Sequence, residues 1–423
     1  MCQWTSQLSI AAKAAKLNNQ GHPTTVSYMN IPSFTLSRLP HIIFGRGVFR
    51  QLPETVKKFG RSALFVVGAK HIQASSSWME IQDQLRTAGV FWFVYEVDCE
   101  PSPEQIDRAV QTFRVKQIDV VIGLGGGSAM DAAKAIAGLL KPGNSVMDHL
   151  EGVGPELTYL GPATPFIAVP TTAGTGSEAT KNAVLSTHGA QGFKKSFRDE
   201  KLVAEIALID PDLLSSCPRE IIAANGMDAF TQLLESYVSS KTNRFSDALA
   251  WSGMKAVRDS LLIWYRDGET AHEAQAGMAY AALLSGITLA QVGLGSVHGL
   301  ASPLGAFFPI PHGVVCGTLV AEATAMNIRA LRERGDKGIL LKYAQAGRMI
   351  THDIQLTDEA ALIKLVQTLA TWVEQMQLPR LSHYGITAAD IPKIVANSRG
   401  SSMKTNPVLL TDDEIAEILL NRL

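Results

Sequence analysis

A strand, a turn and a helix are encoded in succession by Ile118-Asp-Val-Val-Ile-Gly-Leu-Gly-Gly-Gly-Ser128 and the residues after it. The apolar, β-branched run up to Leu124 is typical of a strand buried on both faces of a parallel sheet. Glycines have no Cβ, so the backbone of the turn can approach a ligand closely, and a helix over 129–140 directs its first N–H groups to the same place. The stretch therefore predicts a turn that binds a phosphate group. Because Ser128 stands where the GxGxxG pattern has its last glycine, a tight turn that needs glycine only for its geometry is the alternative.

Short strands recur on both sides of this turn. They are predicted at 61–67, 90–95, 118–124 and 165–169. Helical spacing at 104–113 separates two of them, and such alternation predicts a parallel sheet covered on both faces. After Asp210 the strand pattern ends and helical spacing takes over. Helices are predicted at 218–238, 245–265, 270–290, 314–329, 338–350, 357–376 and 411–420. The fold class is therefore an α/β N-terminal domain with a parallel sheet, followed by an all-α C-terminal domain.

The length of 423 residues corresponds to two ordinary domains. We expect a polar N-terminal extension over 1–31, an α/β domain over 32–212 and a helical domain over 213–423. Hydrophobic residues make up 46% of the chain and charged residues 18%, which indicates a globular protein. The 38 Lys and Arg residues nearly balance the 39 Asp and Glu residues, so charge gives no reason to expect nucleic acid or an anionic membrane as a partner.

The cysteines and the N-terminus bear on location. Cys2, Cys99, Cys217 and Cys316 are scattered, with no CxxC pair and no disulfide-framework spacing, which is typical of a reducing cytoplasm. The N-terminus lacks a charged-then-apolar signal pattern. Apolar stretches are interrupted by Gly, Pro or charges before the roughly 18 residues that a transmembrane helix needs. We therefore expect a cytoplasmic protein without transmembrane segments.

A second loop, Val169-Pro-Thr-Thr-Ala-Gly-Thr-Gly-Ser-Glu178, directly follows a predicted strand. Its hydroxyl groups can donate hydrogen bonds to phosphate or carboxamide oxygens, and its glycines allow the backbone to come near a ligand. A merely polar turn is a poor explanation for so many hydroxyls after a buried strand. Two such loops in one α/β domain predict a dinucleotide-binding site.

Metal-binding residue types gather in the helical half. Asp228 and Gln232 are one helical turn apart and therefore share a face. His298 and His312 each stand before a glycine, and Pro311 predicts a helix start at His312. One carboxylate and two imidazoles suit Zn²⁺ or Fe²⁺ with a coordination position left for substrate. Histidines beside glycine are also common as packed or capping residues, which is the alternative.

Several motifs together resemble the iron-containing, or group III, alcohol dehydrogenase family. In chain order these motifs are Phe44-Gly-Arg-Gly, Gly125-Gly-Gly-Ser-Ala-Met-Asp-Ala-Ala-Lys134, Pro170-Thr-Thr-Ala-Gly-Thr-Gly-Ser-Glu178, Leu208-Ile-Asp-Pro211, Gly226-Met-Asp-Ala229, Val297-His-Gly-Leu-Ala-Ser-Pro-Leu-Gly305 and Pro311-His-Gly313. The resemblance covers residues 32 to 420. It implies a dinucleotide-binding domain, a helical domain and a metal in the cleft between them.

The resemblance also implies roles for individual residues. Those implied to bind NAD or NADP are Gly68, Gly125, Gly126, Gly127, Ser128, Asp131, Thr171, Thr172, Thr175 and Lys194. Within this set Gly126, Gly127 and Ser128 are implied to hold the diphosphate, the threonines to line the nicotinamide side, and Lys194 to reach the ribose. The implied ligands of a divalent metal, Fe²⁺ or Zn²⁺, are Asp228, Gln232, His298 and His312. The implied catalytic residues are Asp228, His298, Ser302 and His312.

Three positions depart from the family pattern. Many iron-containing members have His where this chain has Gln232, and a neutral amide is a weaker ligand than imidazole, so we expect weak metal binding. A second His expected near the nicotinamide is Ser302 here, so a proton relay would pass through a hydroxyl or water. No carboxylate follows the strand at 61–67, where NAD-selective members carry Asp, and Lys70 could pair with a 2′-phosphate.

We therefore expect a metal-dependent oxidoreductase that transfers hydride between NAD(P)(H) and a small alcohol, aldehyde or ketone, acting as a homodimer or larger homo-oligomer. A maleylacetate-reductase-like enzyme that needs no metal is the first alternative. A sugar-phosphate cyclase of the dehydroquinate-synthase type is another, but it would need Lys and Arg in the cleft, and the stretch 300–309 has none. A non-catalytic dinucleotide-binding protein with a decayed metal site is the third.

Overall fold

The computed structural model describes residues 31–68, 75–189, 191–334 and 337–423. Almost all of the expected N-terminal extension, together with Cys2 and Lys70, lies outside these residues. The chain divides into two units, residues 1–34 and 35–423, and residues 31–34 form no helix or strand. All elements named below belong to the second unit.

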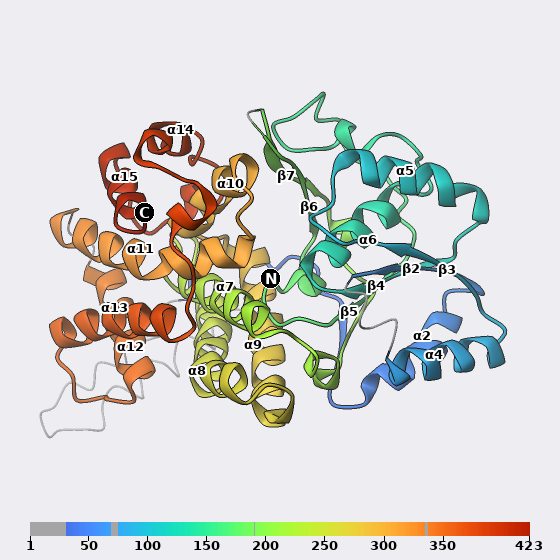
Figure 1. The fold of residues 1–423 in the computed structure, drawn as a ribbon, viewed down its shortest axis with the longest axis horizontal. Helices are drawn as coiled ribbons and strands as arrows, with labels where there is room; N and C mark the ends of the chain where they lie inside the picture. The colour runs from blue at the N-terminus through green and yellow to red at the C-terminus, as the bar shows by residue number, and fades with distance from the viewer. Residues whose placement is uncertain (1–30, 69–74, 190, 335–336) are drawn as a thin grey trace, which may run out of the picture. The chain divides into compact units, whose positions relative to one another are not determined.

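Within the described residues, six strands form a parallel sheet in the order β1–β8–β5–β4–β2–β3 (Figure 1). These strands are β1 (His41–Phe44), β2 (Ser62–Val67), β3 (Phe91–Glu96), β4 (Val120–Gly125), β5 (Phe166–Pro170) and β8 (Ile206–Ile209). In the register of the central strands, Leu124 pairs with Val67, and Gly125 pairs with Pro170. The glycine-rich turn after β4 therefore lies between Gly68 and the threonine-rich loop, at one edge of the sheet.

Both faces of the sheet are covered, as the sequence predicts. Leu64 of β2 belongs to a core that includes side chains of α5 (Pro103–Phe113) and α6 (Gly127–Leu139). The next residue, Phe65, belongs to a second core on the other face, formed with α2 (Leu52–Lys57) and α4 (Ser76–Thr87) (Figure 1). Alternate side chains of a strand point to opposite faces, so this arrangement explains why the strand is apolar throughout.

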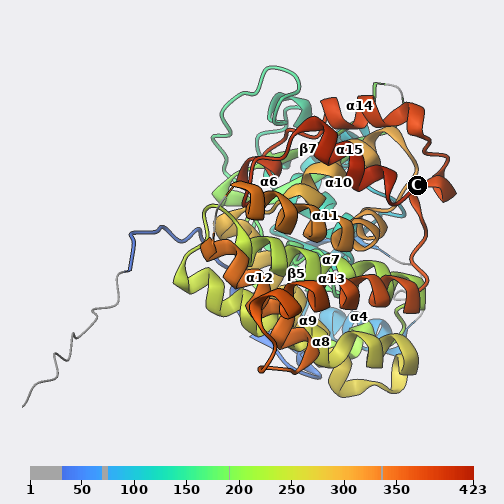
Figure 2. The same ribbon diagram turned by 90° about the vertical axis from the view of Figure 1, so that its left-hand side faces the viewer.

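The helical region follows the sheet. Its helices are α7 (Arg219–Val238), α8 (Arg244–Asp267), α9 (His272–Val292), α10 (Ser296–Phe307), α11 (His312–Arg334), α12 (Lys337–Thr351), α13 (Asp358–Gln375), α14 (Ile391–Ala396) and α15 (Asp412–Leu420). Helix α7 packs against α8, α9 and α11 and is buried along nearly its whole length (Figures 1 and 2). Polar side chains on α7 are therefore forced into the protein interior, where each needs a partner. The predicted start of α15 is confirmed by a capping box between Thr411 and Glu414.

Some elements differ from the prediction. Four features were not predicted: the edge strand β1, its neighbour β8, helix α10, and an antiparallel hairpin of β6 (Asn182–Thr187) and β7 (Phe193–Arg198). The hairpin carries polar residues and is largely half-buried, so it lacks the apolar run of a buried strand. Helix α10 contains Pro303 and two glycines, Gly299 and Gly305, which ordinarily argue against a helix. Helix α6 begins at Gly127, earlier than predicted, with Gly126 as its N-cap.

Helix α11 is long and apolar enough to span a membrane by length and composition, although Gly317 and Glu322 interrupt its apolar stretch. However, 83% of its most apolar window is buried inside the protein, as expected for a core helix. Its first residue, His312, lies at the candidate site described below.

Candidate active site

A cavity of about 1130 Å³ lies at the carboxyl edge of the sheet and extends to the helical region. The glycine-rich turn and the threonine-rich loop line one part of it, and α7, α10 and the start of α11 line another. Among the described residues, every residue with a predicted role lines this cavity except Gly125, and Lys70 lies outside the described residues. Segments far apart in the sequence, around residues 126, 172, 228, 298 and 312, are thus brought together.

The glycine-rich turn packs tightly against its neighbours. A Cβ on Gly125 would lie 2.9 Å from the backbone nitrogen of Gly68, so glycine is required there by packing alone. A Cβ on Gly126 would lie 3.1 Å from Oγ1 of Thr172, and one on Gly127 would lie 2.9 Å from Cγ2 of Thr175. The turn thus contacts the threonine-rich loop directly. Because the first N–H groups of a helix have no intrahelical acceptor, the start of α6 on the cavity wall suits an anion.

A buried lysine connects α6 to the threonine-rich loop. Nζ of Lys134 donates to Oγ of Ser177 at 2.7 Å and to Oγ1 of Thr180 at 2.8 Å. Ser177 in turn donates to Oδ1 of Asp131 at 2.6 Å. Lys134 has no exposed surface, so these bonds compensate for the burial of its charge. The network fixes the loop against α6, and it shows that the Asp131 carboxylate is engaged within the protein.

Lys194 of β7 forms an ion pair with Glu100, a residue that the sequence analysis did not identify. Burial raises the pKa of Glu100, but the Lys194 ammonium, together with His312 and the Ser186 hydroxyl, lowers it below its usual value. Ser302 of α10 donates its hydroxyl to the backbone oxygen of Lys194 at 3.1 Å. The two predicted site residues are therefore linked to each other, and the Ser302 hydroxyl is already engaged.

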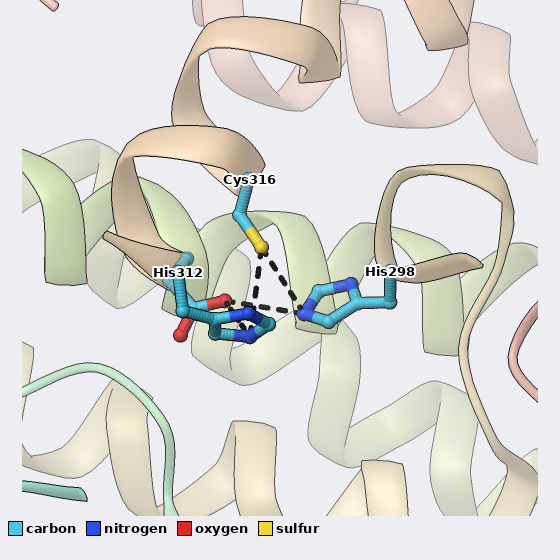
Figure 3. A group of neighbouring side chains, drawn as sticks. His298, His312 and Cys316 are labelled. Atoms are coloured by element: carbon cyan, nitrogen blue, oxygen red, sulfur yellow. Dashed lines mark hydrogen bonds and ion pairs between the residues drawn. The ribbon is translucent and has the colours of Figure 1, made fainter. Parts of the chain in front are cut away.

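Four potential ligands meet where α7, α10 and α11 converge. The candidate ligand atoms of Asp228, His298, His312 and Cys316 all lie within 4.8 Å of one another. Oδ1 of Asp228 is 3.1 Å from Nε2 of His298 and 3.8 Å from Nε2 of His312. Figure 3 shows the His298, His312 and Cys316 side chains pointing toward one another. Oδ2 of Asp228 is buried without a hydrogen-bond partner among the described residues, so the donor set and this orphaned atom fit a divalent cation.

The charges of this cluster are strongly coupled. Burial raises the pKa of Asp228, but the His312 and His298 rings outweigh it and lower the pKa to about 2. Burial lowers the pKa of His298, but the Cys316 sulfur and the Asp228 and Glu235 carboxylates raise it well above its usual value. Burial and the nearby Lys194 ammonium lower the pKa of His312 to about 4, so this ring is neutral at pH 7 and can bind a cation.

Comparison with known proteins is in accord with this site. A family model described as iron-containing alcohol dehydrogenase matches residues 40–211, and one for the C-terminal part of that family matches residues 222–423. The chain belongs to the iron-containing alcohol dehydrogenase family. It is 28% identical over 388 residues to an NAD-dependent methanol dehydrogenase of Bacillus methanolicus, covering 91% of this chain and 98% of that one. It is 30% identical over 358 residues to a lactaldehyde reductase of Escherichia coli K12, covering 83% and 89% of the two chains.

A solved structure of a related protein has the same fold as this chain. The crystal structure of an archaeal halo-thermophilic alcohol dehydrogenase from a Red Sea brine pool matches with a TM-score of 0.84 at 26% identity, covering 94% of this chain and 100% of that one. The family resemblance and the predicted fold class are confirmed, and this member of the iron-containing alcohol dehydrogenases is an oxidoreductase of alcohols and aldehydes.

The cleft of this family member contains cationic side chains that the stretch 300–309 does not reveal. Lys194, which the resemblance implied to bind the cofactor, lines the cavity together with Lys195, Arg198 and Lys404. Three of them come from the β6–β7 hairpin that the sequence analysis missed. Arg198 is paired with Glu151 at 3.0 Å, as Lys194 is with Glu100. The case against a cyclase therefore rests on membership of the alcohol dehydrogenase family and not on a lack of cations.

Two further site residues were missed, although their spacing from predicted site residues gives a partial signal for each. Cys316 is four residues after His312, in a helix whose start at Pro311 was predicted, so both side chains had to share a face. Glu235 lies two turns after Asp228 on α7, and its Oε2 is 2.7 Å from Nδ1 of His298. Residue spacing along α7 could not reveal that Glu235 bonds to His298, because His298 lies on a different helix. Gln232 has a buried Oε1 atom without a partner among the described residues.

Proposed function

We propose that this protein transfers hydride between a nicotinamide dinucleotide and a small alcohol, aldehyde or ketone at a divalent metal in the cavity. The observation that carries the proposal is that the start of α6 and the Asp228–His298–His312 cluster line the same cavity. A volume of about 1130 Å³ is ample for a dinucleotide with a small substrate. The proposal divides the chain into a dinucleotide-binding domain over 32–212 and a metal- and substrate-binding domain over 213–423.

The cofactor-binding role is assigned to the glycine-rich turn and its neighbours. N–H groups of Gly126, Gly127 and Ser128 would bind the diphosphate, because they lie at the start of α6 and favour negative charge. Hydroxyls of the threonine-rich loop would bind the nicotinamide side. Those hydroxyls belong to Thr171, Thr172 and Thr175. Lys194 would reach the ribose while its ammonium stays beside Glu100.

The metal role is assigned to Asp228, His298 and His312, with Gln232 as a further, weaker ligand from the same helix as Asp228. A bound Fe²⁺ or Zn²⁺ supplies a Lewis acid that polarises the substrate oxygen. The protein orients the imidazoles and excludes water by burying the carboxylate, which is 0% exposed. A proton relay through Ser302 would require its hydroxyl to turn from the backbone oxygen of Lys194 toward the cavity.

Both NAD and NADP are proposed as cofactors. Gly68 follows β2, where no carboxylate stands to repel a 2′-phosphate. NADPH should therefore bind no more than about tenfold more weakly than NADH, a difference of about 1.4 kcal/mol. Fluorescence titration with both cofactors measures this, and a preference for NADH of about a hundredfold or more would overturn it.

Metal analysis of the purified protein, paired with oxidation of NADH and NADPH against short aldehydes, keto acids and maleylacetate, tests the proposal. We expect His312→Ala to lose metal and activity together while the fold is retained. Full activity of a metal-free preparation would favour the metal-independent, maleylacetate-reductase-like alternative, which Gln232 makes the strongest competitor. A homodimer or larger homo-oligomer in the cytoplasm belongs to the same proposal, and light scattering tests the oligomeric part.

A further inference from the structure

Cys316 lies one turn after His312 on α11, and its sulfur points to the same place as the two imidazoles (Figure 3). Sγ is 3.5 Å from Nε2 of His298 and 3.8 Å from Nε2 of His312. In a tetrahedral zinc site, bond lengths of about 2.05 Å to nitrogen and about 2.3 Å to sulfur put the two ligand atoms about 3.6 Å apart. The two observed separations lie on either side of that value, so the thiol lies at the distance from both imidazoles that a metal ligand would have.

Asp228 provides an observation that is independent of the cysteine. Its Oδ1 atom lies 3.1 Å and 3.8 Å from the two imidazole nitrogens, against about 3.3 Å for nitrogen and oxygen ligands of tetrahedral zinc. Its Oδ2 atom is buried and has no hydrogen-bond partner among the described residues. A buried carboxylate oxygen without a partner costs free energy unless a cation or a donor meets it. The Oδ1 separations therefore match those of metal ligands around the point to which Cys316 also points, and the same carboxylate keeps an unpartnered acceptor in the protein interior.

Cys316 approaches the centre of the Asp228–His298–His312 cluster from the protein interior and not from the cavity. Asp228, His298 and His312 line the cavity, whereas Cys316 does not and has 0% exposed surface. Cys316, His298 and Glu235 are hydrogen-bonded in the order of a Cys–His–acid triad, but a thiol behind the imidazoles cannot meet a substrate in the cavity. Its place suits a ligand that leaves the cavity side of the metal open.

We propose that Cys316 is a strong protein ligand of the metal, beside Asp228, His298 and His312, and that it supplies the donation that the weak Gln232 amide, in place of an imidazole, does not. This inference rests on the metal site of the proposed function. Coordination as a thiolate releases the thiol proton to solvent. Because a thiolate is a soft ligand, this set selects Zn²⁺ over Fe²⁺ more strongly than a carboxylate with three imidazoles does.

Cobalt(II) substitution tests the inference without relying on turnover. We expect the Co²⁺-loaded wild type to show visible ligand-field bands together with a near-ultraviolet sulfur-to-cobalt charge-transfer band. Cys316→Ser should lose the charge-transfer band and bind Co²⁺ at least about tenfold more weakly, since even residues behind the ligands have effects of that size. Cys217→Ser is the matched control, because Cys217 lines the same cavity outside the metal cluster, and it should keep both sets of bands.

A ligand swap sharpens the test. The double variant Gln232→His/Cys316→Ser restores an imidazole on α7 and removes the sulfur on α11. We expect it to regain the Co²⁺ affinity that Cys316→Ser loses, without regaining the charge-transfer band. In competition dialysis against Zn²⁺ and Fe²⁺, its ratio of bound Zn²⁺ to bound Fe²⁺ should fall below that of the wild type.

The outcomes separate this inference from the proposed function. Ligand-field bands without a charge-transfer band in the wild type would overturn Cys316 as a ligand and leave the metal site standing. A charge-transfer band that persists in Cys316→Ser would also overturn it, because the sulfur would belong to another cysteine. Failure of the wild type to bind Co²⁺ would overturn both the inference and the proposed metal site. The first and last results are read on the wild type, so a Cys316→Ser variant that does not fold leaves the test intact.

Discussion

Glu235 accepts a hydrogen bond from Nδ1 of His298 at 2.7 Å, while the other ring nitrogen of His298 lies 3.1 Å from Asp228. The same carboxylate accepts the N–H of Val297 at 2.7 Å, so it fixes both the start of α10 and the orientation of the imidazole. A carboxylate behind a metal-binding imidazole sets its tautomer and strengthens it as a ligand. Glu235 is therefore a positioning residue for the proposed metal.

Glu235→Gln should lower the affinity for a divalent metal by about 10- to 100-fold. The amide preserves the size of the side chain and one acceptor but removes the charge that favours the Nδ1–H tautomer. Competition with a chelator measures the affinity, and circular dichroism checks that the fold is retained. Glu178→Gln, at another buried carboxyl group outside the metal cluster, should leave metal affinity unchanged. Equal affinity in Glu235→Gln and the wild type would show that Glu235 only supports the fold.

The sheet and the main helices could be predicted because their sequence patterns are local. Buried strands such as Val120–Gly125 are continuous apolar runs, and Pro311 marks the start of α11. The hairpin β6–β7 could not be predicted this way, because its half-buried strands carry Lys194 and Lys195 and gain their order from pairing with each other. Helix α10 was not predicted because Pro303 has a low helix propensity, although tertiary packing tolerates it there.

Glu178 gives a pH-dependent prediction. Burial raises its pKa from 4.5 to about 7, only partly offset by Lys134. Between these values the folded protein holds a proton that the unfolded chain has released, so the stability due to this group is present at low pH and is lost as the pH rises through 7. Glu178→Gln should therefore raise the Tm at pH 8 and change it little at pH 5. The largest gain in the free energy of unfolding is about 3.5 kcal/mol, because the shift is about 2.5 pKa units at about 1.4 kcal/mol each. A gain that is the same at both pH values would refute a buried, titrating Glu178.

Gly126 gives a prediction about cofactor binding. A methyl group there would press on Thr172 at 3.1 Å and narrow the space at the start of α6. Gly126→Ala should therefore weaken binding of NADH or NADPH by at least about tenfold, or about 1.4 kcal/mol, with little change in Tm. Gly400→Ala, which adds the same methyl group to open space elsewhere on the cavity wall, is the control. Unchanged cofactor affinity in Gly126→Ala, measured by fluorescence titration, would mean that the turn needs glycine only for its own geometry.

The metal cluster was only partly predictable, because tertiary packing brings its residues together. Asp228, His298 and His312 could be recognised from their residue types and motifs, because metal ligands are chemically distinctive. Whether they meet depends on how α7, α10 and α11 converge, and no local pattern specifies that. Cys316 was passed over because a single buried cysteine usually behaves as a small apolar residue. Its significance depends on its separation from two imidazoles, which is a tertiary fact.

The last prediction concerns Gln232. It lies one turn after Asp228 on α7, lines the cavity, and has a buried Oε1 atom without a partner among the described residues. An imidazole nitrogen is a stronger donor to Fe²⁺ or Zn²⁺ than a neutral amide oxygen, which usually serves harder cations. Gln232→His should therefore tighten divalent metal binding by at least about tenfold, or about 1.4 kcal/mol, seen as slower loss of metal to a chelator. Gln232→Leu keeps similar bulk without a ligand atom and should not tighten binding. If Gln232→His releases metal as fast as the wild type, this position does not face the metal, and the amide serves the substrate or the cavity wall instead.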